Sequence, residues 1–218
     1  MTWSELSEIL GVGLQETAYM VGVSTVLTAV GGLLVGVLLV LTDRGGLLTA
    51  PPVNAVLGLV VNVGRSLPFI ILLVAVIPFT RAIVGTTIGT SAAIVPLTIG
   101  AIPFFARIVE SAIRDVPPDV VAAAVAMGAT RRQIVGKVLL REARPGLVAG
   151  LTITVVALVG YSAMAGVVGG GGLGDLAIRY GYQRFETEVM VATVVVLVVF
   201  VQLIQMLGDL IVRRLSHR

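Results

Sequence analysis

The side chains that most often carry out chemistry are scarce in this chain of 218 residues. There is no cysteine, His217 is the only histidine, and Lys137 is the only lysine. Thiolate metal sites, a histidine-based triad and a Ser–Lys pair within an apolar segment are therefore excluded. We expect no catalytic residue and no metal site in this sequence.

Two other patterns bear on the source of energy. The glycine run 169–174 could cradle a phosphate, but it does not follow a strand in a βαβ unit, and the sequence contains no Gly-x-x-x-x-Gly-Lys-[Ser/Thr] run. We interpret it as tight packing or an irregular turn, with a role in an outer gate as the alternative. No Asp or Glu lies deep in a long apolar segment, as a proton relay would require. We therefore expect this chain to obtain its energy from a partner.

Positive charge is concentrated in one polar block, Arg107–Arg144, which carries seven basic residues. It begins with Glu110 and Arg114, spaced as an ion pair on a helix surface. Pro117-Pro118-Asp119 is typical of the start of a new helix. Small side chains follow, and Gly128 is placed to end that helix in a left-handed conformation.

A third short helix is predicted from Thr130 toward Leu140, because Thr130 and Gln133 form a capping-box pair. Connections in helical bundles usually run about 2–8 residues, so a purely structural loop would be shorter than this one. We predict a partner-docking element, with a segment resting on the inner leaflet as the alternative. The basic side chains at its rim would be Arg131, Arg132 and Lys137.

The composition indicates a protein whose main solvent is lipid. Of the residues, 57% are hydrophobic and 12% charged, whereas a soluble domain is about 25% charged. A bilayer core of about 30 Å needs roughly 20 apolar helical residues, and the alternation typical of a barrel is absent. We predict an all-α integral membrane protein with five transmembrane helices, near 17–41, 54–79, 86–108, 145–166 and 187–210.

The orientation follows from the basic residues of the short loops, eleven on one side against three on the other. This places the N-terminus outside, the C-terminus inside and the docking loop, about 115–142, in the cytoplasm. We predict a transmembrane domain over residues 17–210 and a cytoplasmic tail over residues 211–218. Since this distribution explains the pI of 9.8, we predict no nucleic-acid binding.

Residues 1–16 carry three glutamates and no basic residue, unlike a secretory signal. Trp3, Leu6 and Leu10 recur at helical spacing, which indicates a short helix lying in the membrane interface. A frayed polar tail is the alternative.

Arg65 lies inside the second predicted span, where a charge costs about 2.5–3.5 kcal/mol on insertion scales. Pro68 follows and would loosen the helix. We favour snorkelling toward the inner headgroups, and a role at a subunit interface or in a pathway is the alternative.

Small residues and prolines in the other spans concern packing. Pro96 and Pro103 in the third span predict a bend, either static or serving as a hinge. Small residues that suit close helix contacts in the first and fourth spans are Gly31, Gly32, Gly36, Gly160 and Gly166.

The block after Pro117 resembles the cytoplasmic signature of ATP-binding-cassette importer permeases. That signature runs Glu-Ala-Ala, three residues, Gly, nine residues, Ile-x-Leu-Pro. Here Ala122-Ala123-Ala124 precedes Gly128 at the same spacing, and Val138-Leu139-Leu140 follows nine residues later. Two positions depart from the signature, because Ala122 replaces the glutamate and Arg141 the proline.

Further segments along essentially the whole chain resemble the methionine importer permeases. They include 65–73, 77–86, 93–98, 158–164 and 171–174. The resemblance implies a type I importer permease fold in the bacterial cytoplasmic membrane, a homodimer bound to two ATPase subunits, and an extracytoplasmic substrate-binding lipoprotein. ATP and Mg²⁺ would bind the ATPase subunits, and this chain would bind no cofactor.

The expected site residues fall into two sets. The translocation pathway would include Ser162 and Met164. The ATPase-coupling set is Ala122, Ala123, Ala124, Met127, Gly128, Ala129, Thr130, Arg131 and Arg132.

Two other functions remain open. A permease for another small amino acid would share all of these features, and the sequence does not separate L- from D-methionine. A secondary carrier or channel subunit would need buried ionisable groups, of which the spans offer few beyond Arg65.

Overall fold

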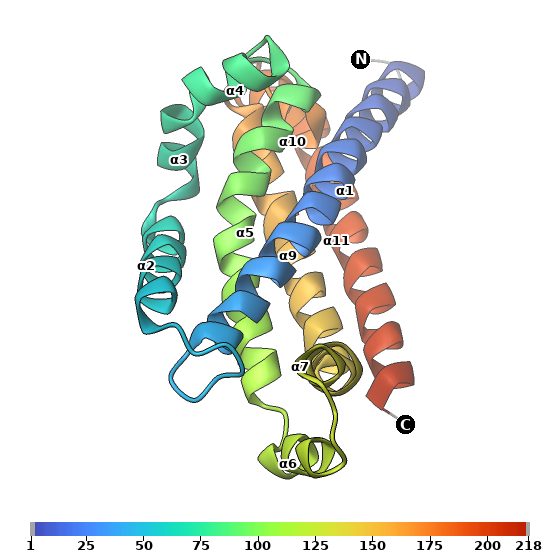
Figure 1. Cartoon of the computed structure of the whole chain (residues 1–218). Coiled ribbons are helices and arrows are strands. Elements are labelled where there is room, and N and C mark those ends of the chain that lie inside the picture. Colours follow the sequence, from blue (N-terminus) through green and yellow to red (C-terminus); the bar gives the residue numbers. More distant parts are fainter. Residues whose placement is uncertain (1–2, 217–218) are drawn as a thin grey trace.

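The computed structural model describes residues 3–216. The first two residues of the predicted N-terminal segment lie outside the described residues, as do His217 and Arg218 of the predicted tail. Regular structure within 3–216 is helical, and long helices form a bundle with short ones at both ends, α4 and α10 at one and α6 and α7 at the other (Figure 1). In chain order the helices are α1 (Trp3–Thr42), α2 (Pro51–Ser66), α3 (Phe69–Ala75), α4 (Ile77–Val84), α5 (Thr90–Arg114), α6 (Pro118–Ala126), α7 (Arg131–Gln133), η1 (Ile134–Leu139), α8 (Leu140–Glu142), α9 (Arg144–Gly166), α10 (Gly172–Leu176), η2 (Ala177–Tyr182) and α11 (Thr187–Ser216).

The described residues contain four helices that are long and apolar enough to cross a membrane, namely α1, α5, α9 and α11. The bent pair α2 and α3 makes a fifth candidate. These segments correspond in order to the five predicted spans, so the all-α membrane fold class is confirmed. The starts of α9 and α11 fall at or next to the predicted residues, whereas α5 and α11 continue for six residues beyond the predicted ends at 108 and 210.

The first helix is longer than predicted. Residues 3–16 continue without a break into the first span as one helix of 40 residues, so the prediction of a separate helix in the interface plane is wrong. Packing explains the continuity, because Leu6 is buried and Gly13 lies against the side chain of Leu176 in α10. The N-terminal half of α1 is therefore held along the bundle.

The second span is broken, which corrects the prediction of one helix over 54–79. The axes of α2 and α3 differ by 106°. Leu67 between them is extended, with φ −81° and ψ 127°. Pro68 has no N–H and its ring clashes with the preceding turn of a helix, so the chain changes direction there.

The crossing of α1 and α5 depends on glycine. A Cβ added at Gly36 would lie 2.6 Å from the carbonyl oxygen of Ala106, so only hydrogen fits at this contact. The predicted packing role is not tested for Gly160, because nothing within the subunit lies within 4 Å of such an added atom. It is confirmed for Gly31, Gly32, Gly36 and Gly166.

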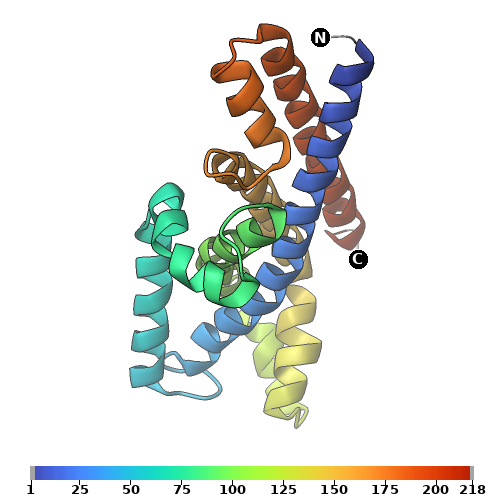
Figure 2. The ribbon, with the colours of Figure 1, turned by 90° about the horizontal axis from the view of Figure 1, so that it is seen from above.

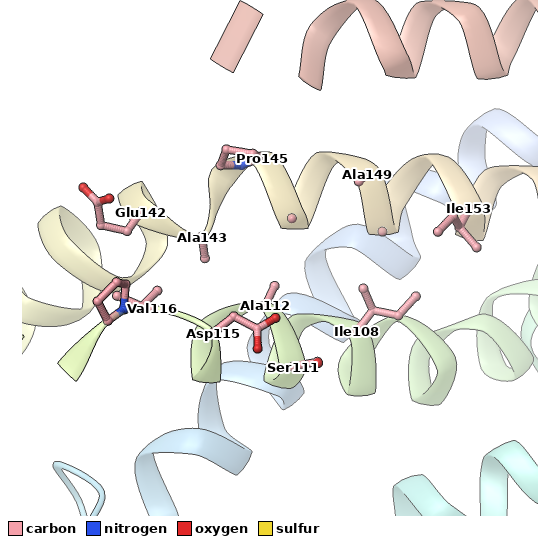
Figure 3. Close-up of a pocket in the computed structure, with 13 residues that line it drawn as sticks. Ile108, Ser111, Ala112, Asp115, Val116, Glu142, Ala143, Pro145, Ala149 and Ile153 are labelled. Carbon is pink, nitrogen blue, oxygen red and sulfur yellow. The ribbon is translucent and has the colours of Figure 1, made fainter. Parts of the chain in front are cut away.

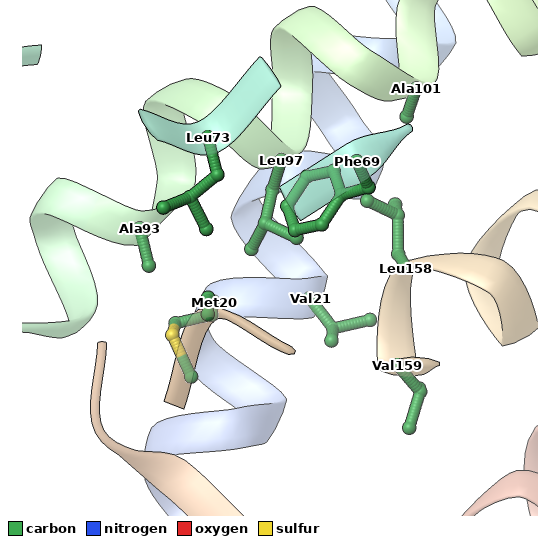
Figure 4. Close-up of a cluster of buried hydrophobic side chains, with 10 residues drawn as sticks. Met20, Val21, Phe69, Leu73, Ala93, Leu97, Ala101, Leu158 and Val159 are labelled. Atoms are coloured by element: carbon green, nitrogen blue, oxygen red, sulfur yellow. The ribbon is translucent and has the colours of Figure 1, made fainter. Parts of the chain in front are cut away.

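The main buried cluster lies where α1, α3, α5 and α9 meet, and Figure 4 shows its side chains pointing toward one another. Leu97 and Leu158 are completely buried in it. The ring of Phe69, the first residue of α3, stacks on Tyr161 of α9 with centroids 4.5 Å apart and planes 7° from parallel. The bend in the second span thus turns α3 over the core.

The glycine run 169–174 covers an irregular turn after α9 and the start of α10, at the end of the bundle away from α6 (Figure 1). Gly169, Gly171 and Gly172 have φ values of 82°, 79° and 78°, which favour glycine. The Gly172 N–H donates to Glu16 Oε2 at 2.6 Å, and the next N–H donates to Thr17 Oγ1 at 2.9 Å. The predicted irregular turn is confirmed, and it ties α10 to α1.

Candidate docking site

The predicted docking loop is built around α6. Asp119 lies in its first turn, after Pro118 at the first helical position. Gly128 follows the helix with φ 78°. Its N–H donates to the Val125 carbonyl at 2.9 Å, and the Ala129 N–H donates to the Ala124 carbonyl at 3.0 Å. This pair of bonds is the Schellman arrangement, and the predicted glycine end of the helix is confirmed.

The next helical stretch begins at Thr130. Its side chain accepts from the Gln133 N–H, while the Gln133 side chain accepts from the Thr130 N–H at 2.8 Å. The predicted capping box is therefore confirmed. The stretch continues through α7, the π-helical η1 and α8 to Glu142. We call residues 118–142 the docking segment.

A buried hydrophobic cluster attaches the docking segment to the membrane helices. Fully burying one large aliphatic side chain contributes about 1.5–3 kcal/mol, so the attachment is strong. A force applied to α6 therefore acts on α5 and α9 as well. The buried members of the cluster are Phe105, Val109, Ile113, Val116, Ala124, Ile134, Leu139 and Ala143.

The opposite side of the docking segment is exposed. Met127 is 82% exposed, so nearly all of its apolar side chain is accessible to a partner. Ala124 is buried in the cluster, so its side chain holds α6 in place and is closed to a partner. Ala129 is half-buried, and the remaining predicted coupling residues are exposed, namely Ala122, Ala123, Gly128, Thr130, Arg131 and Arg132.

A groove of about 390 Å³ lies beside the docking segment, between the ends of α5 and α9. Figure 3 shows it lined by small and aliphatic side chains such as Ala112 and Ala149, with the carboxylates of Asp115 and Glu142 toward one end. Neither carboxylate has an ion-pair partner within residues 3–216. The sequence analysis did not select these acids. Asp115 precedes the docking segment and Glu142 is its last residue, so both can offer negative charge to a partner.

A polar network joins α1, α2 and α5 at the α6 end of the bundle. The predicted pair of Glu110 and Arg114 is present at 3.0 Å. Arg114 also binds Asp43 at 2.6 Å, and Arg107 donates to Glu110 at 2.5 Å and to Asn62 at 2.6 Å. Asp43 and Asn62 were missed because they lie 71 and 45 residues from their partners in sequence.

The hydrogen bond from Arg114 holds the pKa of Asp43 below its usual value of 3.8, with a smaller effect of the Arg44 N–H. Since the folded state favours the charged form, this carboxylate stabilises the fold fully above its ordinary pKa. That contribution is lost as the pH falls through the lowered value. The tie between the α1–α2 connection and α5 is therefore complete at neutral pH.

One face of α9 is open along its length. Ile153, Gly160 and Met164 lie seven and four residues apart, which places them on one helix face, and all three are exposed. Met164 is 47% exposed. Ser162 is buried and its hydroxyl donates to the Val159 carbonyl at 2.8 Å. Of the two predicted pathway residues, Met164 thus lies on the open face and Ser162 points into its own subunit.

The described residues contain no group of three or more His, Cys, Asp or Glu that could hold a metal ion. They present membrane-length helices, with a helical segment packed across one end whose exposed face carries a methionine and unpaired charges. These features define the class: a multi-pass integral membrane protein with a helical segment packed across one end.

The family follows from comparison with known proteins. Residues 32–218 match the family model described as binding-protein-dependent transport system inner membrane component. The chain belongs to this family of inner membrane transport proteins. The resemblance to importer permeases that the docking segment indicated is therefore confirmed.

Two relatives and one solved structure illustrate the similarity. The probable D-methionine transport system permease protein MetI of Vibrio cholerae is 56% identical over 212 residues, covering 97% of this chain and 94% of that protein. The methionine import system permease protein MetP of Bacillus subtilis is 45% identical over 166 residues, covering 76% and 75%. A chain of the inward-facing MetNI methionine ABC transporter has a TM-score of 0.96 at 51% identity, covering 99% of both chains. The type I importer permease fold is thereby confirmed.

Proposed function

We propose that this chain is the permease subunit of an ATP-driven importer that carries methionine across the bacterial inner membrane. The observation that carries the proposal is the extent of the similarity. The chain is 56% identical to a methionine permease over 97% of its length, and 51% identical to a chain of a methionine transporter over 99%. This similarity includes both the membrane helices and the docking segment, so it supports the same substrate and the same mode of coupling.

In the proposed assembly two copies of this chain bind two ATPase subunits. ATP and Mg²⁺ bind to those subunits, and this chain has no hydrolytic activity of its own. An extracytoplasmic binding lipoprotein delivers the substrate. Gly160 on the open face of α9 supports the pairing of two copies, since a small residue with open space around it lets another helix approach closely.

The exposed side of the docking segment is the proposed contact with the ATPase. Met127 supplies apolar area, the small side chains of Ala122 and Ala123 permit close approach, and charge surrounds them. Ala124 lies beneath and transmits the motion to α5. The complete coupling set is Ala122, Ala123, Ala124, Met127, Gly128, Ala129, Thr130, Arg131 and Arg132.

The substrate pathway is proposed to follow the open face of α9, with the N-terminus of the chain outside the cell and the docking segment inside. Met164 lies on this face. Ser162 acts from behind it, because its bond to the Val159 carbonyl fixes the last turns of α9. Closure of the ATPase dimer moves the docking segment, and the helices on either side of the pathway move with it.

Reconstitution tests the proposal. The permease, its ATPase and the binding protein are placed in vesicles, and uptake of labelled methionine is measured with D-methionine and other small amino acids as competitors. Uptake should require both the ATPase and ATP. Uptake that persists without the ATPase would indicate a carrier or channel. If only another amino acid competes, that amino acid would be the substrate in place of methionine.

The docking assignment has its own test. Gly128→Arg places a bulky cation at a position with φ 78° on the exposed face and should abolish both complex formation and uptake. Unchanged assembly would contradict the proposed contact.

A further inference from the structure

A cavity of about 260 Å³ lies under the bend of the second span, far from the docking segment in the chain. Its size is close to the lower end of the range of about 300–1,000 Å³ for small-molecule pockets, which suits a ligand as small as a free amino acid. Its walls come from α2, α3, α5 and α9, and seen from above α2 and α3 stand beside α5 and α9 (Figure 2). The lining residues are Gly64, Arg65, Leu67, Phe69, Leu72, Gly100, Phe104 and Tyr161.

Arg65 lies in the last turn of α2, next to the bend, and its side chain is exposed in the single subunit. It is the fifteenth residue of α2, which begins at Pro51 at the α6 end, and fourteen steps of a helix extend about 21 Å. That length is about two thirds of a hydrocarbon core of about 30 Å, so α2 carries Arg65 well away from its α6 end. Snorkelling toward the inner headgroups stays a prediction, and the cavity beside Arg65 supports the alternative of a role in a pathway.

The guanidinium of Arg65 has no partner inside the subunit. Among residues 3–216, no carboxylate forms an ion pair with it and no side chain accepts a hydrogen bond from it. Charges within membrane segments usually mark a substrate or ion pathway. The group is thus a free cation at the wall of a small cavity.

The other walls suit an apolar side chain. The stacked rings of Phe69 and Tyr161 form one wall, and Phe104 adds a third aromatic ring. A thioether sulfur makes favourable contacts with aromatic rings. The last turn of α2 ends at this cavity, and a helix C-terminus presents carbonyl oxygens that can accept from an ammonium group.

We propose that this cavity binds the amino acid in transit, with Arg65 paired to its α-carboxylate and the aromatic wall against its apolar side chain. This inference rests on the proposed function, because it takes methionine as the substrate. It adds a site within the membrane helices that recognises the carboxylate common to all amino acids. Both isomers of methionine present that group to Arg65.

Cysteine labelling tests the site directly, since the chain contains no cysteine. Leu67 lines the cavity and is 44% exposed, so Leu67→Cys gives one reactive thiol in this subunit. Maleimide labelling of the subunit is followed in the permease–ATPase complex without binding protein. Methionine should slow it, and methionine amide, which lacks the carboxylate, should need at least about tenfold higher concentration.

Variants of Arg65 in the same background provide the second arm. Arg65→Gln should raise the protecting concentration of methionine by about tenfold or more and should remove the difference between methionine and its amide, while Arg65→Lys should retain part of both. Arg81→Gln is the matched control, because Arg81 is exposed on α4 and outside the cavity. Its protecting concentration should not change.

Equal protection by methionine and its amide overturns the proposal, as does full protection in Arg65→Gln. The comparison of the two ligands needs no change at Arg65, so it decides the matter even if Arg65→Gln fails to assemble. Uptake by the Leu67→Cys complex separates the two hypotheses. Transport of methionine without protection from labelling would refute the binding role of this cavity alone. The absence of ATP-dependent methionine transport by the unaltered complex would refute the proposed function.

Discussion

Replacing Met127 with alanine should weaken binding of the ATPase while leaving the permease fold intact. Met127 is 82% exposed in the free subunit, so nearly all of its apolar surface can become buried on docking. Burying a methionine side chain contributes about 1.5–3 kcal/mol. A loss of about 2 kcal/mol corresponds to a dissociation constant about 30-fold higher.

The assay is a titration of labelled ATPase subunit into permease held in lipid nanodiscs. Met206→Ala is the matched control, because Met206 is 65% exposed on α11 and lies outside the docking segment. Its affinity should equal that of the unaltered chain, and both variants should unfold at the unaltered temperature. Unchanged affinity in Met127→Ala, or an equal loss in Met206→Ala, would refute the reasoning that exposed apolar area on the docking segment drives assembly.

Three further changes test the packing, the charge tie and the cap. Gly36→Ala places a Cβ 2.6 Å from a backbone carbonyl oxygen and should destabilise the subunit by about 1–3 kcal/mol, measured by unfolding in detergent. Gly22→Ala is the control and should not destabilise it, because open space surrounds Gly22. Equal effects of the two changes would contradict the close crossing of α1 and α5. Arg114 lowers the pKa of Asp43, so the unaltered chain should lose stability as the pH falls below 3.8. Asp43→Asn should lack this pH-dependent loss of stability. Identical pH profiles of the unfolding temperature in the two proteins would show that the bond between Asp43 and Arg114 contributes nothing. Thr130→Val removes the capping hydroxyl and should reduce helix stability by about 1 kcal/mol, which would appear as faster hydrogen exchange at the start of α7. Thr130→Ser keeps a hydroxyl and should retain the protection. Equal exchange in the two variants would argue against the cap.

Local signals in the sequence predicted much of the docking segment. Gly128 has the positive φ that its place after a run of small residues implied, and Thr130 with Gln133 forms the expected capping box. Both features depend on residues that are near one another in the chain. Hydropathy likewise located α9 and α11, because lipid exposure requires an apolar surface over their whole length.

Local signals in the sequence could not predict features that depend on residues far apart in the chain or on the direction of a helix. Hydropathy does not record the direction of a helix, so the 106° bend at Pro68 was predicted as a continuous span. The continuity of α1 depends on the contact of Gly13 with α10, far along the chain. The place of Arg65 beside a cavity became clear only once α2, the bend and the helices around it were all known.

The length of α1 has a practical consequence for experiments on this subunit. A helix of 40 residues extends about 60 Å, twice the thickness of the hydrocarbon core of about 30 Å. The uncharged stretch of α1 begins at Thr17 and runs to Thr42. The turns of the helix before Thr17 therefore stand clear of the bilayer on the side away from α6. A fluorophore or affinity tag fused ahead of Trp3 would sit on a stiff stalk, giving energy-transfer measurements a fixed reference point that leaves the bundle untouched.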